Sequence, residues 1–155
     1  MGEILSLLQD FDVAKFLPPP ETIVTKLELL MRVAVMVGPL VILGLGLWFY
    51  LAPPKEANHR VGFRTYWGMG SVEAWQYTQR LAGVLYSLLG TVMTVVLSLV
   101  CNGFRGMNPM KMASITIVCV VVEFVLIIGA WTYIHIAVYR HYDKDGNPKP
   151  QKRKK

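Results

Sequence analysis

The chain has little charge. Asp, Glu, Lys and Arg make up 17% of its 155 residues, whereas a typical soluble domain has about 25%. None of the four occurs in 33–54 or 81–104, and Glu123 is the one example in 112–139. An apolar stretch of about 20 residues is long enough for a helix to cross the bilayer hydrocarbon. The sequence therefore excludes disorder and a soluble globule, and it predicts an all-α bundle of three transmembrane helices. The predicted spans cover about 33–52, 81–102 and 113–138.

Cysteine is scarce as well, since Cys101 and Cys119 are the only two. They form no CxxC pair, and we expect both to be unpaired small residues packed in helices. The motifs HExxH, GxSxG and the P-loop are missing. Three spans also leave no room for an independent catalytic domain. We therefore expect a protein that is not an enzyme, with no cofactor and no metal site.

The net charge of +6 is unevenly distributed. Of the 16 Lys and Arg residues, 11 lie in the loop 53–80 and the tail 140–155. The positive-inside rule therefore predicts a multi-pass membrane protein with its N-terminus outside and its C-terminus in the cytoplasm. The basic tail is expected to have no fold of its own and to attract anionic lipid. No nucleic-acid partner is expected.

The predicted domain organisation has three parts. Residues 1–32 form an amphipathic N-terminal segment, 33–139 the three-helix membrane domain, and 140–155 the cytoplasmic tail. Within the first part, 3–16 is expected to be a short interfacial helix, and the absence of a basic region before it argues against a signal peptide. A second helix is expected to begin near Glu21 and to continue into the first span, with a candidate kink at Gly38-Pro39.

Polar residues follow one face of two spans. In the second span the face consists of Ser87, Thr91, Thr94 and Ser98, and in the third of Thr116, Cys119 and Glu123. Since a carboxylate near the midplane is costly, Glu123 must face the bundle, protonated or partnered. We expect the two faces to meet. They are either a packing seam with Glu123 as a hydrogen-bonding link between helices, or a polar conduit.

The loop between the first two spans is rich in aromatic residues, which is unusual for a linker. Ser71 is a candidate N-cap with Glu73 in the first turn of a helix that begins at 72 and continues into the second span. One interpretation is a folded cap in which Arg64 bonds carbonyls or Glu73. The other is a binding surface for an anionic lipid headgroup or a peptide, with charge-assisted donors on Arg60, Arg64 and Arg80.

This loop resembles the signature loop of the SdpI family of bacterial membrane proteins. The matching positions are Asn58, Gly62, Arg64, Thr65, Trp67, Ser71, Glu73, Trp75 and the run Gln79-Arg80-Leu81-Ala82-Gly83. Longer members have more spans, and this chain resembles their C-terminal three-span unit. Three positions depart from the family pattern: Tyr66 replaces a common Pro, Gly68 a common Thr, and Gln79 the usual His or Asn.

The best-known member of that family gives immunity to a secreted toxic peptide, so the resemblance implies protection against, or sensing of, a membrane-active peptide. The candidate binding residues in the loop are Asn58, Arg60, Gly62, Arg64, Thr65, Trp67, Glu73, Trp75 and Arg80. The alternatives are an accessory subunit of a larger membrane complex and a small oligomeric transporter that uses Glu123. Expected partners are the bilayer, anionic headgroups, and a toxic peptide, another membrane protein or a second copy of the chain.

Overall fold

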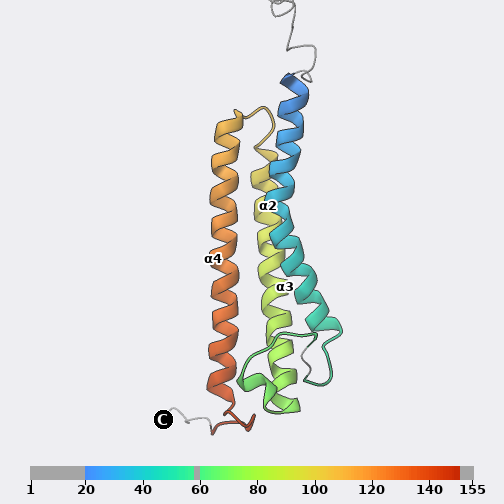
Figure 1. Ribbon diagram of the computed structural model, residues 1–155, viewed down its shortest axis with the longest axis vertical. Helices are drawn as coiled ribbons and strands as arrows, with labels where there is room; N and C mark the ends of the chain where they lie inside the picture. Colours follow the sequence, from blue (N-terminus) through green and yellow to red (C-terminus); the bar gives the residue numbers. More distant parts are fainter. Residues whose placement is uncertain (1–19, 58–59, 151–155) are drawn as a thin grey trace, which may run out of the picture.

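The structure is a computed structural model that describes residues 20–57 and 60–150. Its main elements are three long helices, which lie alongside one another (Figure 1). They are α2 (Pro20–Leu51), α3 (Val72–Asn102) and α4 (Pro109–His141), with a short 3-10 turn, η2 (Trp67–Met69), before α3. Each long helix is apolar and long enough to cross a membrane. The predicted all-helical fold with three spans is confirmed, whereas the helix predicted over 3–16 lies outside the described residues.

The helix ends follow from local chemistry. Ser71 caps α3 as predicted, because its side chain accepts a hydrogen bond from the Ala74 N–H. Asn108 caps α4 by accepting from the Met110 N–H, and Pro109 occupies the first helical turn. As predicted, one helix joins 72–80 to the second span. α4 extends beyond its predicted span at both ends, to Pro109 and His141.

Glycine brings α2 and α3 into close contact. A Cβ atom at Gly46 of α2 would overlap the backbone of Ser87 on α3, and one at Gly90 would overlap the backbone of Leu43. A Cβ atom at Gly83 would likewise overlap the backbone of Tyr50. Small residues allow such close approach between helices in lipid. α2 contains Pro39 and bends along its length (Figure 1), in agreement with the predicted kink.

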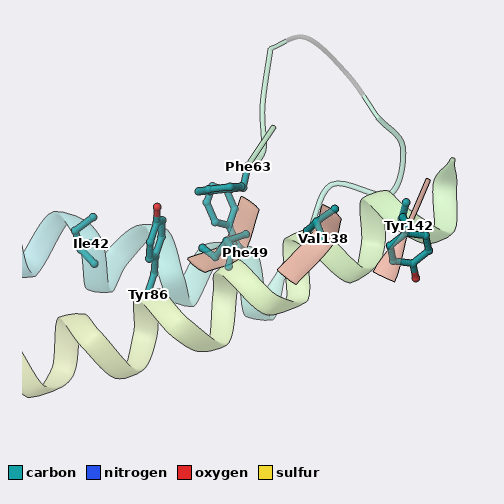
Figure 2. Close-up of a cluster of buried hydrophobic side chains, with 9 residues drawn as sticks. Ile42, Phe49, Phe63, Tyr86, Val138 and Tyr142 are labelled. Atoms are coloured by element: carbon teal, nitrogen blue, oxygen red, sulfur yellow. The ribbon is translucent and has the colours of Figure 1, made fainter. Parts of the chain in front are cut away.

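The buried side chains form two groups, one toward each end of the bundle. The group near the loop 52–71 includes Phe49, Phe63, Tyr86 and Val138. In Figure 2 the Phe63 ring points from the loop toward Phe49 of α2. The other group consists of Val35, Met93, Leu97, Cys101, Phe104 and Met112. Because Phe63 is 8% exposed, the loop contributes to the core and is part of the fold.

The C-terminal segment has structure that we did not predict. After α4 ends at His141, the chain turns back on itself, and the Asp143 N–H donates to the Asn147 carbonyl at 3.0 Å. The Lys149 N–H then donates to the His141 carbonyl at 2.8 Å. The expectation of a tail without a fold of its own is therefore wrong for 140–150. Residues 151–155, with most of the basic run, lie outside the described residues.

Candidate functional site

The loop is attached to α3 by the side chain of Gln79. The Gln79 Nε2 donates to the Phe63 carbonyl at 2.7 Å, and the Phe63 N–H donates to Gln79 Oε1 at 2.8 Å. Gln79 is fully buried. The preceding residue, Gly62, has φ +114°, and a Cβ there would overlap the ring of Trp75. Only glycine therefore lets the loop approach α3 closely enough for this pair of bonds.

Trp75 provides a second attachment, one helical turn before Gln79. Its indole Nε1 donates to the Pro54 carbonyl at 2.7 Å, and its side chain is fully buried. Residues four apart on a helix lie on the same face, so Trp75 and Gln79 hold the beginning and the middle of the loop on one side of α3. Neither contact was predicted.

The turn at η2 is closed by Thr65, which is buried and accepts a hydrogen bond from the Gly68 N–H at 2.9 Å. A Cβ at position 68 would come within 2.5 Å of the hydroxyl oxygens of Thr65 and Thr78. A threonine, common at this position in the family, would not fit here unless these two side chains moved. The departure at Gly68 therefore has a packing reason.

The turn 142–149 docks on the same end of α3. The Ser71 hydroxyl donates to the Gly146 carbonyl at 2.8 Å while it caps α3. Gly146 has φ +77°, and a Cβ there would overlap the Ser71 backbone. Burial raises the pKa of the Tyr142 phenol, and the Glu73 carboxylate adds to this shift. We call the loop 52–71 together with the turn 142–149 the loop cap.

The outer surface of the loop cap combines aromatic and basic groups. Trp67 packs on the ring of Tyr139 with centroids 4.8 Å apart, and Lys149 Nζ lies 4.2 Å from the centroid of the same ring. Lys149 also donates to the Tyr139 carbonyl at 2.7 Å. Tyr66 is 73% exposed. Further exposed side chains are those of Arg60, Arg64, Glu73 and Arg80.

The predicted loop residues therefore separate into two groups. Gly62, Thr65 and Trp75 hold the cap together from inside. Arg60, Arg64, Glu73 and Arg80 lie on its surface, with the half-buried Trp67 between the groups. Asn58 lies outside the described residues. Gln79, Ser71 and Gly146 are the residues that sequence reasoning missed as cap contacts. Two features of the sequence could have indicated these contacts. Gln79 belongs to the run that matches the family, and glycines stand in both segments, Gly62 in the loop and Gly146 in the C-terminal turn.

The intramembrane polar residues are arranged differently from the prediction. Ser87 and Thr91 of α3 line a groove with Leu47 and Tyr50 of α2. We expected the polar face of the second span to meet the face that contains Glu123. This prediction is wrong for Ser87 and Thr91, because the glycine contacts place α2 against them. Thr91 and Ser98 donate to carbonyls of their own helix. The oxygens of Ser87, Thr94 and Thr116 have no hydrogen-bond partner in the described part of the chain.

Glu123 is 5% exposed, which confirms that it faces the bundle. Its Oε2 lies against Gly38 of α2, since a Cβ at Gly38 would overlap it. With Cys119, Met93 and Leu97, Glu123 also lines a cavity of about 200 Å³ between α3 and α4. Cys101 and Cys119 are free thiols. Within 20–57 and 60–150, no cluster of three or more His, Cys, Asp or Glu residues could hold a metal ion.

Comparison with known proteins bears on both regions. No curated protein and no solved structure matches the chain. The sequence model of the SdpI/YfhL protein family matches residues 55–137, just over half of the chain. The match includes most of the loop, all of α3 and nearly all of α4. With three helices able to span a membrane, the molecule is a multi-pass membrane protein, and the chain belongs to the SdpI/YfhL family.

Proposed function

We propose that this protein protects a bacterial cell against a membrane-active peptide, or senses one, without catalysing a reaction. The class of function comes from the family resemblance, since the best-known member confers immunity to a secreted toxic peptide. The loop cap is the proposed binding surface. It combines the family's signature residues with a fold that holds them in place.

One observation supports this proposal most strongly: the exposed side chains of the cap stand on a fixed base. The bonds from Gln79 and Trp75 attach the loop to α3, and Ser71 attaches the C-terminal turn. A preorganised surface loses less entropy on binding than a flexible loop does. Tyr and Trp provide amphipathic contact area, and Arg provides bidentate donors for carboxylate or phosphate groups.

We further propose that the loop cap faces the cytoplasm of a bacterial cell. The loop 52–71 and the turn 142–149 lie at the same end of the bundle (Figure 1), and most of the Lys and Arg residues in the described part of the chain lie at this end. In a cysteine-free background, a cysteine replacing the exposed Lys144 should react with an impermeant maleimide only after the cells are opened. Labelling in intact cells would show that the loop cap faces the outside of the cell, which would contradict the proposed orientation.

The function is tested by survival. A sensitive bacterium that expresses the chain should tolerate higher concentrations of at least one peptide in a panel of membrane-active peptides than the same host with an empty vector. The panel should include cationic, anionic and neutral peptides. Unchanged killing by every peptide, at confirmed membrane expression, would contradict protection. A complex that co-purifies in mild detergent would instead favour the accessory-subunit alternative.

A further inference from the structure

The middle of α4 has a single buried side chain. Between Thr116 and Ile134, every residue of α4 except Glu123 is exposed or half-buried. Glu123 is 5% exposed. The remaining surface of this part of the helix consists largely of Val, Leu, Ile and Phe side chains that suit a lipid environment. Near Glu123, the side chains of Cys119, Ile127 and Ala130 are partly buried and pack against the two groups of core residues, so Glu123 is the one fully inward side chain of α4 at this depth.

That carboxyl group meets α2 where the helix lacks one of its backbone hydrogen bonds. Oε2 lies against Gly38, and the next residue is Pro39, inside the helix. Proline has no N–H, so the carbonyl of Val35, four residues earlier, lacks its helical donor. Val35 and Pro39 are both fully buried. A backbone carbonyl without a donor at membrane depth is costly, and neighbouring side chains commonly satisfy it.

An ionised carboxylate would not suit this position. A carboxylate only accepts hydrogen bonds, and so does the Val35 carbonyl, so a carboxylate oxygen and this carbonyl oxygen would repel each other. A protonated carboxyl group has an O–H that it can donate. Around Glu123 the neighbours are Gly38 on α2, Met93 and Leu97 on α3, and Cys119 on its own helix. Arg32, on the same helix as Gly38, forms an ion pair with Glu28. Within the described part of the chain, Glu123 Oε1 has no hydrogen-bond partner.

We propose that Glu123 is held as the neutral acid and donates its proton to the α2 carbonyl that Pro39 leaves without a donor. Glu123 is then a positioning residue that fixes the middle of α4 on α2. Gly38 is required because any side chain there would displace the carboxyl group. This role does not depend on the proposed function of the loop cap, and it differs from an ion path, in which the same carboxyl would have to release its proton.

A double-mutant cycle tests the proposed bond. Glu123→Gln keeps a donor of similar shape, whereas Glu123→Met fills similar space without one. In equilibrium unfolding in mixed detergent micelles, we expect Glu123→Met to raise the unfolding constant about three- to tenfold, in line with hydrogen bonds measured between membrane helices. Glu123→Gln should remain close to the parent. In a Pro39→Ala background, which restores the N–H, the effect of Glu123→Met should become smaller.

Two outcomes of the cycle would overturn the proposal. One is equal damage by Glu123→Gln and Glu123→Met, which would show that the charge matters and not the donor. The other is an unchanged effect of Glu123→Met after Pro39→Ala. Infrared spectroscopy gives a readout that does not require an unfolding variant. The purified protein should have the carbonyl stretch of an un-ionised carboxyl group at neutral pH, and Glu123→Gln should lack it. Absence of this band from the parent protein would also overturn the proposal.

Discussion

At the scale of single residues, Gln79 explains both the fold of the loop and a departure from the family pattern. Its amide has a donor and an acceptor, and both bond the backbone of Phe63. Histidine, usual at this position, has the same two capacities on its two ring nitrogens, and asparagine has them on a shorter side chain. From the sequence, Gln79 was only a departure from the residues usual at this position. The structure identifies a hydrogen-bonding requirement, which spacing alone could not reveal because the partner is sixteen residues away.

Gln79→Glu tests this requirement with almost no change in shape. A glutamate keeps the acceptor for the Phe63 N–H but loses the donor to the Phe63 carbonyl, and it places a charge in a fully buried position. We expect a loss of at least about 1–3 kcal/mol in the free energy of unfolding, the usual cost of an unsatisfied buried partner, because the buried charge adds to that cost. Unfolding in mixed micelles measures it.

The matched control is Gln76→Glu, the same substitution at an exposed position of the same helix. It should change the free energy of unfolding by less than about 0.5 kcal/mol, as surface substitutions usually do. Equal effects of the two substitutions would show that Gln79 does not hold the loop through its amide.

At the scale of elements, local signals predicted more than contacts between distant segments. Ser71 was predicted as an N-cap and the helix through 72–102 as continuous, because both depend on neighbouring residues. We predicted incorrectly which helix packs against the polar face of α3 at Ser87. Gly46, on a different helix, decides that α2 meets this residue. The turn 142–149 was missed for the same reason: it depends on Ser71, more than seventy residues away.

This turn also has a predictable pH dependence. Asp143 accepts from the N–H groups of Asn147 and Asp145, and these bonds, with that of Asn147 largest, lower the pKa of its carboxyl below the ordinary 3.8. Because the pKa is lower in the folded turn, the stabilisation is complete above the ordinary value. It is lost as the pH falls through the folded value.

We therefore expect the Asn147 amide to be protected from hydrogen exchange at neutral pH and to lose protection in acid below about pH 4. Exchange measured by NMR or mass spectrometry on the protein in micelles would follow this change, after correction for the intrinsic dependence of exchange on pH. Asp143→Ala should remove the protection at every pH. Protection in that variant equal to the parent's would contradict the role of the carboxylate.

At the scale of the whole molecule, the number of spans followed from charge alone, because the cost of burying charge in lipid leaves few alternatives. The loop cap did not follow, because Phe63, Thr65 and Gln79 are buried by contacts that no periodicity encodes. The result is a membrane bundle with a folded surface at one end. In our account, binding depends on this surface, whereas Glu123 fixes the helices that support it.

The central claim is that the loop cap binds the peptide. The most direct test uses a peptide from the survival panel against which the chain protects the cell. This peptide is titrated into purified protein in nanodiscs. We predict saturable binding by the parent chain. Thr132→Val, an exposed position on α4, should bind equally well. Gln79→Leu, which removes both bonds to Phe63, should bind at least about tenfold more weakly, a difference of about 1.4 kcal/mol. Equal binding by Gln79→Leu, with the variant shown to be folded, or no more binding to the parent than to empty nanodiscs, would contradict the claim.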